Sequence, residues 1–234
     1  MKERLFRFKQ FNVSHSRSAL PIGVDGVLIG AWGDCSGQRL LDVGCGCGVI
    51  ALMLAQRNPD AEVYAIDIHE PSVEESNENF LNSPWSERLK ASLMDFSVMA
   101  ASGEKFDRIV SNPPFFNSGV NQPSSARLAA RHQGGLSPAT LIEKGSGMLT
   151  ADGRISMIVP SEMEDDLDEV ASRHGLQPVR KCLVRDHETS PYKRIMLEYG
   201  KNGDIIRENI TMFEPDGTPT DRYRYLCGQF YLKF

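Results

Sequence analysis

Short apolar runs alternate with amphipathic stretches along most of the chain. Seven runs have the length and side-chain pattern of β-strands, at residues 38–43, 62–68, 88–93, 106–111, 154–159, 179–184 and 194–199. Helical patterns lie between them, at residues 49–56, 71–82, 137–149 and 160–174. Strands that alternate with helices form parallel sheets covered on both faces, and the last two strands suggest an antiparallel hairpin at one edge. We therefore predict a doubly wound α/β fold with a mainly parallel sheet of seven strands.

The composition is that of an ordinary globular domain. The chain has 234 residues, of which 41% are hydrophobic, and no repeat or linker divides it. Its net charge of -5 means that a nucleic-acid partner would have to be held by local basic patches. The longest apolar run, residues 49–55, is too short to span a membrane, and Cys45 and Cys47 lack the second pair that a zinc site needs. These features predict a cytoplasmic protein with no membrane and no metal partner.

A glycine-rich loop between the first strand and the first helix is a candidate binding site. Gly44, Gly46 and Gly48 have the spacing G-x-G-x-G, whereas loops that bind the pyrophosphate of a dinucleotide have G-x-G-x-x-G. Asp42 would repel a phosphate, but it would suit a ligand that carries an ammonium group. S-adenosylmethionine has such a group at its methionine end. We therefore expect this loop to bind S-adenosylmethionine.

Two acidic residues follow the next two strands. Asp67 stands at the end of the second strand, and Asp95 follows the third. Ligands of doubly wound sheets bind outside the carboxyl ends of the strands. We expect Asp67 to accept hydrogen bonds from both ribose hydroxyls of the methyl donor and Asp95 to meet its adenine amino group.

The tetrapeptide Asn112-Pro113-Pro114-Phe115 closes the fourth strand. A residue before proline is held in extended geometry, and two prolines fix the backbone that follows, so the Asn112 side chain has one preferred direction. The Asn112 carboxamide oxygen and the Pro113 carbonyl oxygen could accept both hydrogens of a planar amine. Phe115 could stack on the ring that bears the amine. The motif therefore predicts methyl transfer to an amine nitrogen.

Together these motifs resemble the class I S-adenosylmethionine-dependent methyltransferases with an Asn-Pro-Pro-aromatic motif, in particular the bacterial tRNA1(Val) (adenine(37)-N6)-methyltransferase family. Further similarity lies in residues 8–11, 15, 17, 23–32, 51–56, 78–79, 83–85, 130–132 and 229–232. The resemblance implies a Rossmann-like methyltransferase fold, a tRNA partner, and N6-methylation of adenine 37 next to the anticodon.

The resemblance also implies roles for individual residues. The cofactor would be bound by Gly23, Asp25, Gly26, Asp42, Gly44, Gly46, Gly48, Asp67, Asp95 and Asn112, and catalysis would depend on Asn112, Pro113 and Phe115. Residues 1–234 would be one methyltransferase domain, in which an N-terminal extension, about residues 1–36, closes the cofactor site through a turn at residues 23–26 and contacts RNA.

Basic residues gather in two segments that would flank the mouth of this site. The candidates for phosphate contacts are Lys2, Arg4, Arg7, Lys9 and Arg17 in the first segment and Arg127, Arg131 and His132 in the second. Such contacts would position an RNA without reading its sequence.

Other interpretations of the motifs stay open. Asn-Pro-Pro also resembles the motif of ribosomal RNA guanine N2-methyltransferases and of protein glutamine N5-methyltransferases, and Phe115 departs from the tyrosine of some relatives. A nicotinamide-dependent reductase or a nucleotide-binding module without enzymatic activity would share the fold but would not need Asn112. The sequence does not indicate an oligomeric state.

Overall fold

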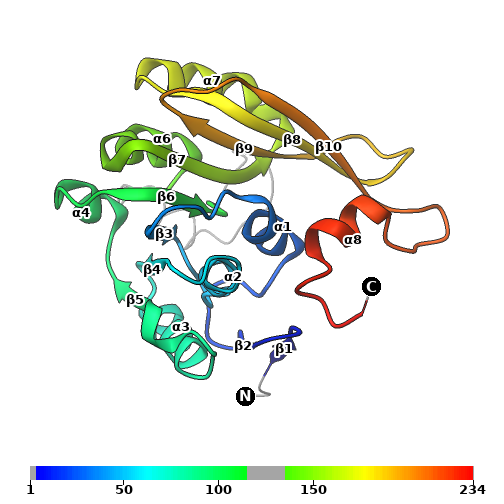
Figure 1. Ribbon diagram of the computed structural model, residues 1–234, viewed down its shortest axis with the longest axis horizontal. Coiled ribbons are helices and arrows are strands. Elements are labelled where there is room, and N and C mark those ends of the chain that lie inside the picture. The colour runs from blue at the N-terminus through cyan, green and yellow to red at the C-terminus, as the bar shows by residue number, and fades with distance from the viewer. Residues whose placement is uncertain (1–3, 115–134, 234) are drawn as a thin grey trace, which may run out of the picture.

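Eight strands form one sheet in the computed structural model, which describes residues 4–114 and 135–233 (Figure 1). They are β3 (Arg39–Val43), β4 (Glu62–Asp67), β5 (Leu89–Leu93), β6 (Phe106–Ser111), β7 (Leu149–Pro160), β8 (Gln177–His187), β9 (Arg194–Gly200) and β10 (Ile206–Phe213), in the spatial order β10-β8-β9-β7-β6-β3-β4-β5. The run from β7 to β5 is parallel, while β9 is antiparallel to both β7 and β8. A separate hairpin pairs β1 (Leu5–Arg7) with β2 (Asn12–Ser14).

Helices cover both faces of the sheet (Figure 1). One face carries α1 (Val24–Trp32), α2 (Val49–Arg57), α3 (Glu70–Leu81) and α8 (Asp221–Cys227), and the other carries α4 (Phe96–Ala101), α6 (Pro138–Gly145) and α7 (Glu164–Arg173). Short 3-10 turns occupy Ser86–Arg88, Ser146–Met148 and Ser161–Met163. Two buried apolar clusters result: in β3, Leu40 packs into the first and Leu41 into the second. Because both faces are covered, the central strands are apolar on both sides.

The doubly wound α/β prediction is confirmed, with one more strand than predicted. β10 pairs with β8 in parallel, so the expected hairpin of β8 and β9 is not itself the edge. The sequence pattern missed β10 because only Ile210 and Met212 are buried on this charged edge strand. The hairpin of β1 and β2 and the helices α1, α4 and α8 were not predicted either. Among the residues that the structure describes, no helix is long and apolar enough to cross a membrane.

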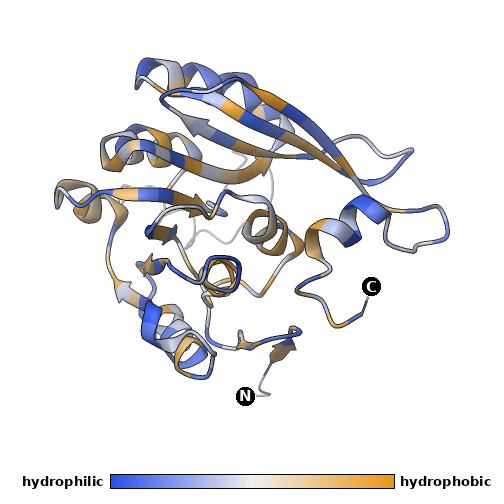
Figure 2. Ribbon diagram, viewed as in Figure 1, coloured by the Kyte–Doolittle hydropathy of each residue, from blue (hydrophilic) through white to orange (hydrophobic). Residues whose placement is uncertain are grey.

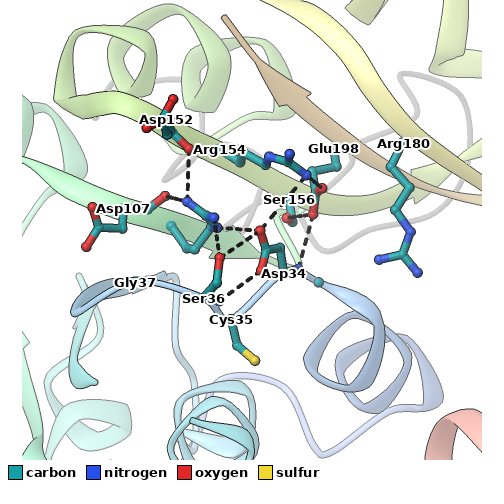
Figure 3. A network of polar contacts seen from close by, with 12 residues as sticks. Asp34, Cys35, Ser36, Gly37, Asp107, Asp152, Arg154, Ser156, Arg180 and Glu198 are labelled. Carbon is teal, nitrogen blue, oxygen red and sulfur yellow. Dashed lines mark hydrogen bonds and ion pairs between the residues drawn. The ribbon is translucent and has the colours of Figure 1, made fainter. Parts of the chain in front are cut away.

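A polar network fixes the amino ends of the central strands (Figure 3). The Asp34 carboxylate accepts hydrogen bonds from Arg108 Nε at 2.7 Å and from Ser36 N at 2.8 Å. Glu198, which is fully buried, accepts from Asp34 N at 3.1 Å and from Arg154 Nη1 at 2.9 Å. These contacts hold the segment that leaves α1, so the first turn of α1 is held at the opposite, carboxyl edge of the sheet.

Candidate active site

The glycine loop joins β3 to α2 at the carboxyl edge. Gly44, Gly46 and Gly48 have left-handed backbone conformations, with φ of 71°, 55° and 79°, which glycine adopts without strain. A Cβ at Gly48 would lie 2.5 Å from the Phe80 ring, so this glycine is needed for helix packing. A Cβ at Gly46 would meet no atom within 4 Å among the described residues. The backbone at Gly46 is therefore open to a ligand.

Asp42 lies beneath this loop rather than on its open side. The side chain is fully buried, and its Oδ2 accepts a hydrogen bond from Ala51 N, in the first turn of α2, at 3.1 Å. Within the described part of the chain, its Oδ1 has no partner. Burial, with a smaller contribution from the Asp67 charge, raises the pKa of Asp42 to about 8. At neutral pH the folded protein therefore keeps the Asp42 carboxyl mostly protonated, and in this conformation the side chain lies beneath the loop, away from its open side.

Asp67 and Asp95 follow the neighbouring strands β4 and β5. Asp67 Oδ2 accepts from Gly46 N and Asp67 Oδ1 from His69 N, both at 2.9 Å. A carboxylate has about four acceptor positions, so Asp67 keeps room for two hydroxyl donors. Asp95 begins α4 as its N-cap, where its Oδ1 accepts from Ser97 N at 2.7 Å. The structure thus joins Asp67 to the glycine loop and gives Asp95 a structural role that leaves its other oxygen available.

Two exposed apolar side chains beside these acids were missed from the sequence. Ile68 directly follows Asp67, and Leu93, the last residue of β5, pairs with Asp67 in the sheet register. Ile68 is 56% exposed and Leu93 is 53% exposed. An apolar ring of a ligand held by Asp67 could cover both. The usable signal in the sequence is an apolar residue placed next to an acid at the end of a strand.

Asn112 lies at the same edge, immediately after β6. Ser111 Oγ donates a hydrogen bond to Val43 O at 2.7 Å, which ties the end of β6 to the residue before Gly44. Pro113 is buried, whereas Asn112 is half-buried, and its carboxamide has no hydrogen-bond partner within residues 4–114 and 135–233. The structure therefore brings Asn112 next to the glycine loop with its acceptor unused. Phe115 lies outside the described residues.

The predicted turn at residues 23–26 is in fact the start of α1. Gly23 is the N-cap, and Asp25 and Gly26 lie in the helix. Asp25 Oδ1 is 2.9 Å from Arg194 Nε, so an ion pair ties the first turn of α1 to the start of β9. Burial raises the pKa of Asp25, although Arg194 acts in the opposite direction. Glycine at residue 23 serves as a cap here because a helix begins where the sequence suggested a loop.

The predicted RNA contacts fall into three groups. Arg4, Arg7 and Lys9 are exposed on or beside the hairpin of β1 and β2. Arg17 forms ion pairs with Glu74, Glu75 and Glu78, which counts against the prediction that it contacts a phosphate. The remaining candidates, Lys2, Arg127, Arg131 and His132, lie outside the described residues.

Comparison with known proteins identifies the family to which the chain belongs. Residues 23–167 match the family model "Methyltransferase small domain". A tRNA1(Val) (adenine(37)-N6)-methyltransferase of Bacteroides fragilis is 36% identical over 237 residues and covers 100% of both chains. One of Aeromonas hydrophila is 36% identical and covers 97% of both chains. The chain belongs to the tRNA1(Val) (adenine(37)-N6)-methyltransferase family. This confirms the predicted family, and S-adenosylmethionine is the methyl donor.

Solved structures of methyltransferases show the same fold. A predicted O-methyltransferase from Agrobacterium tumefaciens aligns with a TM-score of 0.68 at 17% identity, over 88% of this chain and 96% of that chain. A 16S rRNA N2 methyltransferase from T. thermophilus, in complex with AdoMet and guanosine, aligns with a TM-score of 0.59 at 17% identity, over 86% of this chain and 50% of that chain. At these identities the likeness concerns the fold alone.

The residues present in this family member fit the methyl donor. The open backbone at Gly46 and the free acceptor positions of Asp67 would suit a ligand with ribose hydroxyls. Burial raises the pKa of the Cys47 thiol in the same loop to about 12. Within the described residues, no group of three side chains that could hold a metal ion occurs.

The buried carboxyl of Asp42 should make stability depend on pH. Its pKa is raised from 3.8 to about 8, so between these values the folded protein holds a proton that the unfolded chain releases. The contribution of this proton to the free energy of unfolding is complete below pH about 4. It falls by up to about 1.4 kcal/mol per pH unit as the pH rises towards about 8. In Asp42→Asn, which keeps an acceptor for Ala51 N, we expect a flatter profile. Urea unfolding of both proteins at pH 4.5 to 8.5 measures the difference, and parallel profiles would contradict it.

Proposed function

We propose that the protein transfers the methyl group of S-adenosylmethionine to N6 of adenine 37 in tRNA1(Val). The main support is the 36% identity to tRNA1(Val) (adenine(37)-N6)-methyltransferases along the whole chain. It agrees with the position of Asn112, whose unused carboxamide follows β6 at the edge that also carries the glycine loop. The cytoplasm is the proposed location because the proposed substrate is a tRNA.

In the proposed reaction, Asn112 and Pro113 orient the amine. Their two oxygens accept its two hydrogens, which directs the nitrogen lone pair at the methyl carbon. The new N–C bond forms as the C–S bond breaks, and the nitrogen then loses one proton. The chain contributes alignment and removal of water more than acid–base chemistry. Phe115 is proposed to stack on the adenine, which must be turned out of its stack to reach this edge.

Family membership argues against the alternatives that are not methyltransferases more strongly than against other methyl acceptors. A nicotinamide-dependent reductase or a binding module without activity does not agree with a methyltransferase family that matches the entire chain. Guanine N2 and protein glutamine acceptors use similar amine chemistry, so the Asn-Pro-Pro motif alone does not exclude them. The full-length relatives favour adenine, and we propose it for that reason.

The N-terminal extension is proposed to form part of the RNA-binding surface. Arg4 and Arg7 are exposed on one hairpin, and no acidic side chain forms an ion pair with either among the described residues. The hairpin is attached to the rest of the protein, because Phe11 packs edge-on against Trp85 with ring centroids 5.6 Å apart and Lys9 N donates to Phe230 O. The two arginines can therefore meet phosphates at fixed positions.

The acceptor assignment predicts a specific product. With S-adenosylmethionine, an unmodified tRNA1(Val) transcript should gain N6-methyladenosine, detected by nucleoside analysis after digestion. A transcript with guanine in place of adenine 37 should gain none. Free adenosine should be a much poorer acceptor because it lacks the contacts that the rest of the tRNA would make with the protein. Methylation of a protein glutamine, or of guanine, with none at adenine 37 would overturn the assignment.

The amine-orienting role predicts a selective loss of rate. Asn112→Ala should bind S-adenosylmethionine with nearly normal affinity, because Asn112 is proposed to act mainly on the acceptor. Single-turnover methylation should fall at least about 10²-fold, as expected when a contact formed mainly in the transition state is removed. Asn209→Ala, which changes an exposed residue of β10, is the control and should keep full activity. Near-normal turnover of Asn112→Ala would refute the role.

The proposed RNA surface predicts a change in salt dependence. Deleting residues 1–9 would be a poor test, since it removes Phe8, which is only 4% exposed. Replacing Arg4 and Arg7 with Gln should instead weaken tRNA binding and reduce the slope of log affinity against log salt by about 1 for each lost contact. Arg173→Gln, an exposed change on α7, is the matched control. Equal slopes for the three proteins would exclude the hairpin from the RNA surface.

A further inference from the structure

Most of the buried side chains of α3 are polar, which is unusual for a helix that packs against a sheet. Ser72, Glu75, Ser76 and Asn79 recur at helical spacing and are between 0% and 5% exposed. Figure 2 shows α3 as a largely hydrophilic helix. A core-facing stripe is normally apolar, and buried polar groups are costly unless they form hydrogen bonds. The partners of these four residues, the α3 polar stripe, therefore indicate what the stripe does.

One set of partners lies in the glycine loop. Ser76 Oγ donates a hydrogen bond to Gly46 O at 2.7 Å, and Asn79 Nδ2 donates to Cys47 O at 2.9 Å. Both acceptors belong to the part of the loop between Gly44 and Gly48. The stripe thus fixes the loop carbonyls on one side and leaves the other side of Gly46 open.

The other set of partners lies in the N-terminal extension. Asn79 Oδ1 accepts from Ser14 N, and its Nδ2 also donates to Ser14 O, both at 2.8 Å. Glu75, at 1% exposed, accepts from the backbone N–H groups of Ser16 at 2.7 Å, Arg17 at 3.1 Å and Ser18 at 2.8 Å. A buried carboxylate that receives three N–H groups holds this segment much more strongly than a neutral side chain would.

Asn79 therefore contacts both the glycine loop and the N-terminal extension. Glu75, one helical turn away, holds the extension more strongly. The segment that Glu75 holds continues to Gly23, the N-cap of α1 at the carboxyl edge. Since the glycine loop and residues 14–18 bind the same face of α3, a displacement of either would alter the hydrogen bonds of the other. This is a continuous physical connection between the proposed walls of the cofactor site.

We infer that Glu75 and Asn79 are positioning residues, which couple docking of residues 14–18 to the donor-binding geometry of the glycine loop. The inference rests on the proposed cofactor contacts at that loop. In this arrangement S-adenosylmethionine binds a loop already fixed by the N-terminal extension, and donor binding in turn stabilises the extension, because coupling between two sites is reciprocal.

The test compares two glutamates of the same helix. Glu75→Gln removes the charge that holds the backbone of residues 16–18. Glu78→Gln removes an exposed carboxylate that, among the described residues, pairs only with the Arg17 side chain. Isothermal titration of each folded variant with S-adenosylmethionine should show a dissociation constant raised about tenfold by Glu75→Gln and less than about twofold by Glu78→Gln. At saturating donor and tRNA1(Val), kcat of Glu75→Gln should be close to that of the wild type.

Hydrogen exchange on the wild type tests the same coupling without any substitution. Addition of S-adenosylmethionine should slow exchange of the amides of residues 14–18, and unchanged exchange there would overturn the proposal even if Glu75→Gln did not fold. Normal donor affinity in folded Glu75→Gln would also overturn it. A wild type that binds no S-adenosylmethionine would refute the cofactor assignment, and the proposal with it, whereas normal donor binding without methylation of tRNA would refute only the acceptor.

Discussion

The parallel register of β3 between β4 and β6 is the constraint on which the site depends. Val43 pairs with Ile66, and Asp42 pairs with Val110, so the glycine loop, Asp67 and Asn112 all leave the sheet at one edge. Parallel strands require long crossovers, and these crossovers are the helices that cover both faces. The same arrangement that buries the sheet therefore also gathers loops from distant parts of the sequence around one ligand.

The sequence of the glycine loop permits its conformation but does not determine it. Three glycines with positive φ give the loop conformational freedom, and contacts from outside the loop restrict it. Asp67 accepts a hydrogen bond from Gly46 N, and the α3 polar stripe donates hydrogen bonds to Gly46 O and Cys47 O. The hydrogen bonds in the stripe offset the cost of burying its side chains. A loop fixed before the ligand arrives loses little conformational entropy on binding.

The sequence allowed prediction of seven of the eight strands of the main sheet, of the glycine loop and of the acids at strand ends, because these depend on local periodicity and on spacing. It did not allow prediction of β10 or of the α3 polar stripe. β10 is recognisable only once β8 offers it an edge, and Glu75 looks like any solvated helix acid until residues 16–18 cover it. The ion pairs of Arg17 could not be predicted for the same reason, since the carboxylates belong to a helix that begins more than fifty residues later.

The two edges of the sheet divide stability from function. At the amino edge, Asp34, Arg108 and Glu198 use their charges on one another and on backbone groups, which rigidifies the fold and leaves little capacity for a ligand. At the carboxyl edge, Asp42 keeps a buried oxygen without a partner, and Asn112 keeps its carboxamide unused among the described residues. A folded chain tolerates such unsatisfied groups at a cost of about 1–3 kcal/mol each when they are buried. Arg39 Nε, at the start of β3, is also buried without a hydrogen-bond partner among the described residues. What distinguishes the carboxyl edge is therefore that Asn112 and the free acceptor positions of Asp67 lie beside the open backbone of Gly46, where a ligand can complete their hydrogen bonds.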